Sequence, residues 1–261
     1  MLLVCDVGNT ETTIGLAESG RIVAHWRVIT NASRTPHEFA MQLRALLDLD
    51  QVTYETVYGA AIGSVVPSVT APLTDGIRLA FGVTPIVVDG TSALPITLDV
   101  DEPQTVGADR IINTLAASRI YERDCIVVDL GTATTYDCIT RDGVFLGGVI
   151  APGVMTSLET LTRRTSKLPA TELHAPTRVI GRRTEECIRS GVVFGAVDAI
   201  TGIVARIRSE WRTGREPLVI GTGGLAAMLA PLCPVLAVVD ADLTLRGLQM
   251  AYELLSADLA G

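Results

Sequence analysis

The fold of this chain is decided by MLLVCDVGNTETTIGLA at residues 1–17 and CIVVDLGTATTYDCIT at residues 125–140, which repeat one pattern. In each stretch a short apolar segment ends at an aspartate, Asp6 or Asp129. A turn with glycine and hydroxyl residues then leads into a second apolar segment. Short apolar runs bounded by Gly, Asn and Asp are typical of strands joined by hairpins. Each copy therefore predicts the start of a three-stranded meander.

The residues that follow each copy extend the same plan. RIVAHWRVI at 21–29 and VFLGGVI at 144–150 predict the third strands, the second after an Asp142-Gly143 turn. Helices and strands then alternate in both halves, and GADRIINTLAASRIY at 107–121 is predicted to be a helix that joins the halves. The other helices are predicted at 36–48, 68–80, 184–211 and 226–231, and the other strands at 56–67, 84–90, 217–226 and 235–240.

This order of elements predicts an α/β protein built by duplication. Each half is expected to form a mixed sheet opened by a three-strand meander and completed by βα units. The predicted domains are residues 1–114, ending in the GADR helix, and residues 115–261. Two such domains are expected to face one another across a nucleotide cleft.

Composition narrows the class of protein. The 261 residues are 48% hydrophobic, 4% aromatic and 19% charged, with a net charge of -8. The apolar content excludes a disordered chain, and the excess of acids predicts no nucleic-acid partner. Residues 217–239 are uncharged and number about 23, enough to cross a bilayer. Because they hold prolines and glycines, they fit strand, turn, helix and strand better, and no membrane partner is predicted.

The cysteines and histidines indicate neither disulfides nor a zinc site. The 5 cysteines are scattered without a C-x-x-C pair, which predicts reduced thiols and a cytoplasmic protein. The first residues show no basic segment followed by an apolar run, so no export signal is predicted. His25, His37 and His174 share no ligand spacing, so zinc binding is not predicted.

The repeated Asp-x-Gly turns suit a phosphate ligand. An aspartate at a strand end can hold a cation or its water shell, glycine lets the backbone approach phosphate oxygens, and hydroxyls and amides donate hydrogen bonds. A single D-x-G-N-T stretch is also an ordinary turn. Two copies at equivalent positions favour a pair of hairpins that hold one nucleotide.

GTGGLA at residues 221–226 matches a dinucleotide fingerprint, and Asp240 ends the next strand where a ribose-binding acid is expected. Only 21 residues follow Asp240, too few for the remaining βαβ units of a dehydrogenase. The dehydrogenase hypothesis therefore fails. A glycine turn before a helix still suits adenosine or phosphate.

VGADRIIN at residues 106–113 places Asp109 and Arg110 in the first turn of a predicted helix. Asp109 there can complement the helix dipole. It can equally accept a proton from a substrate hydroxyl, for which it must stay ionised, while Arg110 holds an anionic group. The pattern alone leaves both interpretations open.

Seven motifs in order resemble the type III pantothenate kinases and cover nearly the whole chain. They are DVGNT, SVVP, VGADRIIN, DLGTATTYD, GGVIAPG, RRTSKLP, and IGRRT with SGVVFG downstream. The resemblance implies two duplicated actin-like (ribonuclease H-like) domains of the acetate and sugar kinase, Hsp70 and actin superfamily. It also implies phosphorylation of pantothenate to 4'-phosphopantothenate with ATP, the first step of coenzyme A synthesis, by a homodimer that needs Mg²⁺ and a monovalent cation, K⁺ or NH₄⁺.

The resemblance also implies roles for single residues. Asp109 would be the proton acceptor and Asp129 the monovalent-cation ligand. The first ATP loop would be Asp6, Val7, Gly8, Asn9, Thr10, Glu11, Thr12 and Thr13, with Thr132 as the second contact. Pantothenate would contact Val100, Gly107, Ala108, Asp109, Arg110 and Thr184.

Val100 departs from the family pattern. Many members have tyrosine there, in a Y-D-N-P run, and this chain has Val100-Asp101-Glu102-Pro103. Loss of one hydroxyl hydrogen bond costs about 1 kcal/mol, or roughly fivefold in affinity, so weaker or differently arranged pantothenate binding is expected. The alternatives are a kinase of the same fold for another small hydroxy acid and a non-catalytic regulatory relative. Retention of Asp6, Asp109 and Asp129 argues against the second.

Overall fold

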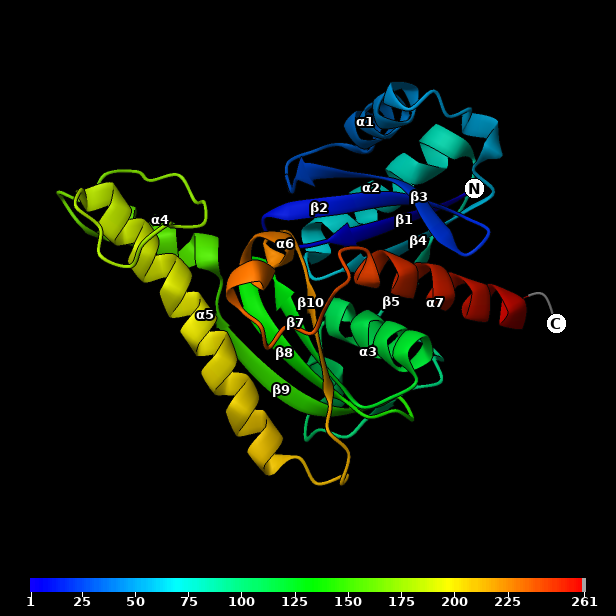
Figure 1. Cartoon of the computed structure of the whole chain (residues 1–261). Coiled ribbons are helices and arrows are strands. Elements are labelled where there is room, and N and C mark those ends of the chain that lie inside the picture. The colour runs from blue at the N-terminus through cyan, green and yellow to red at the C-terminus, as the bar shows by residue number, and fades with distance from the viewer. Residues whose placement is uncertain (260–261) are drawn as a thin grey trace. The chain divides into compact units, whose positions relative to one another are not determined.

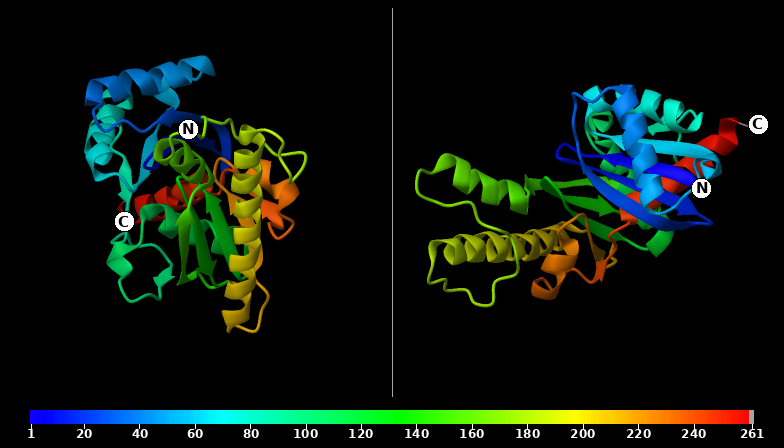
Figure 2. Two further views of the ribbon diagram at one scale, coloured as in Figure 1. Left: turned by 90° about the vertical axis from the view of Figure 1, so that its left-hand side faces the viewer. Right: turned by 90° about the horizontal axis from the view of Figure 1, so that it is seen from above.

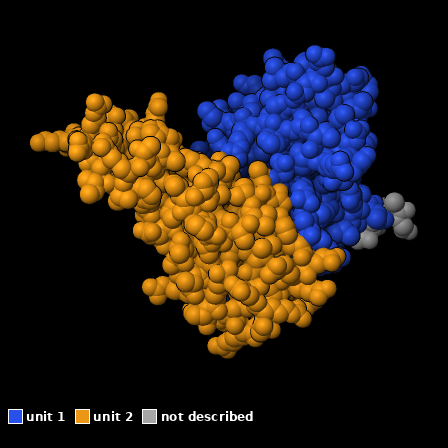
Figure 3. All heavy atoms as spheres, in the orientation of Figure 1, with its two compact units in different colours: residues 1–120, 242–261 blue, residues 121–241 orange. Residues whose placement is uncertain are grey.

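The computed structural model describes the backbone of residues 1–259 and the side chains of residues 1–257. Figure 1 labels the elements, and Figure 2 shows the same chain from two further sides. The chain forms two compact units, coloured separately in Figure 3. Unit 1 is Met1–Ile120 with the described residues from Asp242 onward, and unit 2 is Tyr121–Ala241.

Unit 1 contains a mixed sheet that begins with the predicted meander. β1 (Leu2–Val7), β2 (Glu11–Glu18) and β3 (Arg21–Ile29) pair antiparallel in sequence order. β4 (Gly59–Ser64) and β5 (Ile86–Val88) extend the sheet in parallel on the other side of β1. The strand order is therefore β3-β2-β1-β4-β5, with β1 at the centre.

Helices cover both faces of this sheet because its central strand is apolar on both sides. Leu3 and Cys5 of β1 pack in one buried cluster with α1 (Pro36–Leu49) and α2 (Pro67–Phe81). The alternate residues Leu2 and Val4 pack in a second cluster with α3 (Ala108–Tyr121) and α7 (Leu243–Leu259). Successive side chains of a strand point to opposite faces. A continuous apolar run such as LLVC therefore requires a helix layer on each face.

Unit 2 repeats the strand plan. β7 (Cys125–Leu130), β8 (Ala133–Ile139) and β9 (Val144–Pro152) form the antiparallel meander. β10 (Leu218–Thr222) and β11 (Val238–Val239) continue in parallel beyond β7. The five strands that unit 2 contributes are ordered β9-β8-β7-β10-β11, which corresponds strand by strand to unit 1. The predicted duplicated α/β class is confirmed.

The helices of unit 2 differ in length and in how much of them is buried. They are α4 (Val154–Arg164), α5 (Thr184–Glu210) and the short α6 (Ala226–Leu229). Val193, Val197 and Ile200 on one face of α5 pack in the unit 2 core. The remaining short element of unit 2 is η3 (Ala230–Leu232), and those of unit 1 are η1 (Tyr54–Thr56), β6 (Thr97–Leu98) and η2 (Pro103–Thr105).

By length and composition alone, α5 is apolar and long enough to cross a membrane, and 39% of its apolar window is buried within the structure. Core helices of soluble proteins meet the same criteria, so this is weak evidence for a span. Residues 217–239, the uncharged stretch long enough to cross a bilayer, form β10, α6, η3 and β11. The prediction of strand, turn, helix and strand is confirmed there.

The packing of α3 and α7 differs from the predicted division at residues 114 and 115. That boundary falls within α3, whose Ile112 and Leu115 pack against Leu248 of α7 in the unit 1 cluster. Gly247 permits this approach, because a Cβ there would lie 2.5 Å from Ile112 Cγ2. The C-terminal helix thus completes the first unit's core. Residues 260–261 of the predicted second domain lie outside the described residues.

Candidate active site

The first glycine turn closes tightly at the end of β1. The Gly8 amide donates to the Glu11 carbonyl oxygen at 3.0 Å, and a Cβ at Gly8 would lie 2.9 Å from that oxygen. Asn9, Thr10 and Glu11 are exposed at the tip of the turn. Glycine is required here so that the backbone can fold back on itself, and the turn presents its polar groups to solvent.

The other residues of the predicted ATP loop lie on the flanking strands. Val7 is buried, and Asp6 and Thr13 are partly exposed and face one another in the β1–β2 register. Thr12 is only 4% exposed, and its hydroxyl lies 2.8 Å from the Thr30 hydroxyl. The predicted contact of Thr12 with ATP stays a prediction, and in this structure its hydroxyl has an internal partner.

Asp109 is the second residue of α3, and its carboxylate lies beside the bare backbone of Gly107. The Arg110 amide donates to Asp109 Oδ1 at 2.9 Å, and a Cβ at Gly107 would lie 2.5 Å from the same oxygen. Desolvation by burial raises the pKa of Asp109 above its ordinary value. The hydrogen bond from the Arg110 amide and the positive charge of Arg110 lower the pKa, but their effect is smaller. Only glycine at 107 leaves room for this carboxylate, and a raised pKa makes it a better proton acceptor.

The SVVP motif connects the first loop to the GADR helix. The Val65 amide donates to the Val7 carbonyl oxygen at 3.1 Å, because β1 and β4 are parallel neighbours that end together. Val65 Cγ1 would in turn lie 3.3 Å from a Cβ at Gly107. The structure therefore brings the end of β1 and the start of α3 to the same edge of the unit 1 sheet.

The second glycine turn follows β7 in unit 2. Thr132 is exposed at its tip, and the Gly131 amide donates to the Ala133 carbonyl oxygen at 3.1 Å. Gly223, at φ +83°, lies against Asp129, and a Cβ there would overlap Asp129 Oδ1. β7 and β10 are paired so that Asp129 faces Thr222. The GTGG turn predicted from residues 221–226 therefore lies directly beside the second loop.

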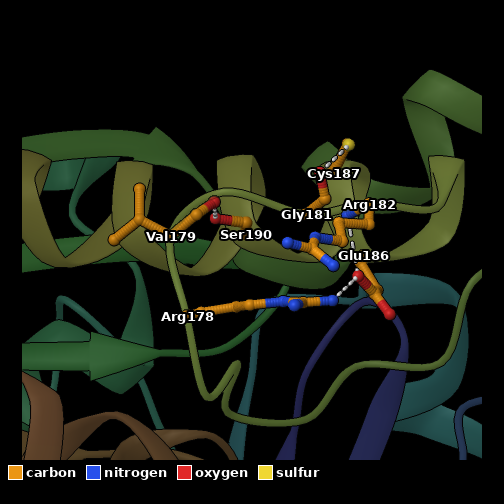
Figure 4. Close-up of polar contacts among 7 residues, drawn as sticks. All are labelled: Arg178, Val179, Gly181, Arg182, Glu186, Cys187 and Ser190. Atoms are coloured by element: carbon orange, nitrogen blue, oxygen red, sulfur yellow. Dashed lines mark hydrogen bonds and ion pairs between the residues drawn. The ribbon is translucent and has the colours of Figure 1, made fainter.

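Thr184 is the exposed first residue of α5, and a salt bridge fixes the segment before it (Figure 4). Glu186 accepts from the Arg182 amide and from Arg178 Nη2, both at 2.8 Å. These bonds, the Arg182 amide first, lower the pKa of Glu186 to about 2. The hydroxyl of Ser190 donates to the Val179 carbonyl oxygen. The loop is thereby anchored to the first turns of α5.

The predicted site residues thus fall into two groups. Unit 1 holds the first loop together with Gly107, the buried Ala108, Asp109 and Arg110, and also the partly exposed Val100. Unit 2 holds Asp129, Thr132 and Thr184. The sequence did not identify Gly223 as the neighbour of Asp129, although a glycine at the end of a predicted strand is a signal of close backbone approach.

The described residues contain no group of three or more His, Cys, Asp or Glu side chains placed to hold a metal ion. His25 instead pairs with Asp242, with 3.1 Å between His25 Nδ1 and Asp242 Oδ1. All five cysteines are free thiols, and Cys187 alone among them is exposed.

Comparison with known proteins shows the family of this chain. The profile of the family described as type III pantothenate kinase matches residues 2–206. A type III pantothenate kinase of Thermomicrobium roseum is 44% identical over 97% of both chains. One of Halalkalibacterium halodurans is 40% identical over 97% of this chain and 99% of its own.

A solved structure shows the same fold at much lower identity. It is described as a putative 2-dehydro-3-deoxygalactonokinase of Sinorhizobium meliloti, with a TM-score of 0.57 at 13% identity. The match covers 97% of this chain and 99% of that one. The two meander-opened sheets are therefore actin-like.

Proposed function

This chain belongs to the type III pantothenate kinases, and we propose on that basis which of its residues carry each part of the reaction. It phosphorylates pantothenate with ATP in coenzyme A biosynthesis. The observation that carries the proposal is the partly buried carboxylate of Asp109, held by the Arg110 amide above Gly107.

Asp109 is assigned as the acceptor of the proton from the primary hydroxyl of pantothenate. Phosphoryl transfer requires alignment and charge neutralisation more than covalent chemistry, so a fixed carboxylate that orients the hydroxyl is sufficient. Arg110 is assigned to the pantothenate carboxylate, because a guanidinium pairs with a carboxylate through two parallel hydrogen bonds. Gly107, Ala108, Val100 and Thr184 complete the proposed pantothenate contacts.

The two glycine turns are assigned to ATP. Both present exposed hydroxyl residues after an aspartate at the end of a central strand, at Thr10 after Asp6 and at Thr132 after Asp129. Backbone amides and hydroxyls at such turns donate hydrogen bonds to phosphate oxygens. Residues 6–13 form the proposed first loop, with Thr132 in the second.

The carboxylates fit the cations that this family is expected to use. Mg²⁺ takes one or two carboxylates plus phosphate oxygens and water, which suits Asp6 without a larger cluster. Asp129, against the bare backbone of Gly223, is assigned to K⁺ or NH₄⁺. When bound, these cations supply positive charge that offsets the phosphate charge.

An ATP-consumption assay with Mg²⁺, with and without pantothenate, tests the site assignment through the monovalent cation. Wild-type activity is expected to require pantothenate and to fall several-fold when Na⁺ replaces K⁺. The Asp129→Asn enzyme should consume ATP slowly in both K⁺ and Na⁺ buffers, because it lacks the negative charge that holds the cation. Asp142→Asn, in an exposed hairpin turn of the same unit, should keep the wild-type ratio. An Asp129→Asn enzyme with an unchanged K⁺ to Na⁺ ratio would remove the cation from Asp129.

The homodimer is proposed to form through the exposed face of α5. Gly191, Gly195 and Gly202 lie on this face, and a Cβ at any of them would meet nothing within 4 Å. Ala199 is also exposed there. Small residues spaced by about one turn let two helices approach closely. The proposed partner at this face of α5 is a second copy of the chain. The protein is proposed to work in the cytoplasm, with no membrane or nucleic-acid partner.

Gly195→Arg is expected to convert the dimer to a monomer, because the new side chain would lie between the packed helices. The monomer fold should survive, since no residue that the structure describes occupies that space. Light scattering after gel filtration measures the mass, and circular dichroism checks the fold. Leu79→Arg, at an exposed leucine of α2, is the control that should remain dimeric. A dimeric Gly195→Arg protein would place the interface elsewhere.

A further inference from the structure

Thr30, directly after β3, forms hydrogen bonds with the backbone of the first glycine turn. Its hydroxyl donates to the Gly8 carbonyl oxygen at 2.7 Å, and its amide donates to the Thr10 carbonyl oxygen at 2.9 Å. The hydroxyl of Thr12 lies 2.8 Å from the same Thr30 oxygen. The side chain and the backbone amide of Thr30 thus contact two residues of the turn, Gly8 and Thr10, and Thr12 at the start of β2.

Thr156, in the first turn of α4, does the same for the second glycine turn. Its hydroxyl donates to the Thr132 carbonyl oxygen at 2.7 Å, and the Gly153 amide donates to that oxygen at 3.1 Å. Gly153 lies so close that a Cβ would be 2.5 Å from the Gly131 carbonyl oxygen. The GGVIAPG motif therefore ends against the second turn.

The two threonines occupy equivalent places in the duplicated fold. Each follows the third strand of its meander, β3 or β9, and each donates a hydroxyl hydrogen to a carbonyl within the turn between the first and second strands. Their local settings differ, because Thr30 follows its strand directly and Thr156 lies in the first turn of a helix. The shared feature is the contact.

We propose that Thr30 and Thr156 are matched positioning residues that orient the two phosphate loops for ATP. The proposal rests on the assignment of these turns to ATP. In a trans peptide the C=O and N–H groups point in opposite directions. A hydroxyl that fixes the Gly8 carbonyl inward therefore turns the Asn9 amide outward, toward the exposed tip. Fixing the Thr132 carbonyl sets the plane of the Thr132–Ala133 peptide in the same way.

The test measures the Kd for a fluorescent ATP analogue and the separate KM values for ATP and pantothenate. Thr30→Val is expected to weaken ATP binding about tenfold and Thr156→Val about fivefold, in line with the hydrogen bonds lost. The KM for pantothenate should stay within about twofold, and Thr30→Ser and Thr156→Ser should restore ATP binding because serine offers the same hydroxyl. A purely structural role would not separate the two substrates.

Controls distinguish this proposal from the loop assignment beneath it. Thr160→Val and Thr56→Val remove hydroxyls that bond carbonyls of their own helix or turn, and they should leave the Kd unchanged. Asp6→Asn and Thr132→Ala test the loops themselves. If Asp6→Asn and Thr132→Ala weaken ATP binding while folded Thr30→Val and Thr156→Val bind ATP normally, the positioning role is overturned and the assignment of the turns to ATP stands. If all four bind normally, the loop assignment falls as well. Should Thr30→Val fail to fold, Thr156→Val on the surface of α4 decides the outcome.

Discussion

Replacing Asp109 by asparagine is expected to lower kcat by about 10³-fold, the usual range for loss of a general base. Asparagine keeps the shape and the hydrogen bond from the Arg110 amide but cannot accept the pantothenate proton. Binding of ATP should be unchanged, because Asp109 is assigned to the other substrate. Steady-state kinetics and nucleotide titration measure the two effects. Asp101→Asn, at an exposed aspartate just before the motif, is the control that should retain activity.

The pH dependence of the wild type tests the same role. Burial raises the pKa of Asp109, and the proton acceptor must be ionised, so kcat/KM should fall as pH decreases through that raised pKa. The midpoint should lie above the value of about 3.9 for an ordinary aspartate. Near-normal turnover by Asp109→Asn, or an acid limb that persists unchanged in it, would exclude Asp109 as the base.

The same shift predicts the effect on stability. Because the raised pKa means that Asp109 binds its proton more tightly in the folded protein than in the unfolded chain, protonated Asp109 stabilises the fold. This stabilisation is fully present below the ordinary pKa of an aspartate. It is lost as pH rises through the raised pKa. At neutral pH, Asp109→Asn should therefore have a Tm equal to or above that of the wild type. A clear fall in Tm would instead indicate a structural role for the carboxylate.

Replacing Arg110 by alanine is expected to raise the KM for pantothenate about 100-fold, with a smaller effect on the KM for ATP. The loss corresponds to about 2.7 kcal/mol, within the range for two charge-assisted hydrogen bonds to a carboxylate. Arg110→Lys keeps the charge but not the planar fork, so an intermediate KM is expected. Initial-rate kinetics with each substrate varied in turn measure the effects.

Arg119→Ala, at an exposed arginine in the last turn of the same helix, is the matched control. It removes an equal charge from α3 and should leave both KM values unchanged. An Arg110→Ala enzyme with the KM of the wild type would remove Arg110 from the pantothenate site. The alcohol form of the substrate, which lacks the carboxylate, should show little difference between wild type and Arg110→Ala.

The strands of both meanders and the helix at GADR were predictable because their signals are local. Apolar runs such as LLVC and CIVV end at an aspartate and a glycine turn, and the α3 start follows a glycine. The helices α4 and α7 were not predicted. Their apolar residues pack against residues far away in the sequence. For example, Leu248 of α7 and Val4 of β1 lie in the same buried cluster. No local pattern identifies that partner.

The sequence by itself determined the duplicated α/β plan and the family, and it supplied Asp109 as the proposed proton acceptor, because strand alternation, turn chemistry and motif order depend on neighbouring residues. Only the tertiary structure decided what surrounds those residues. It placed Gly107 under the Asp109 carboxylate, Gly223 against Asp129, and Thr30 and Thr156 behind the two turns. These contacts join residues whose proximity follows from strand pairing and helix packing, and such proximity is not encoded in any single stretch of chain.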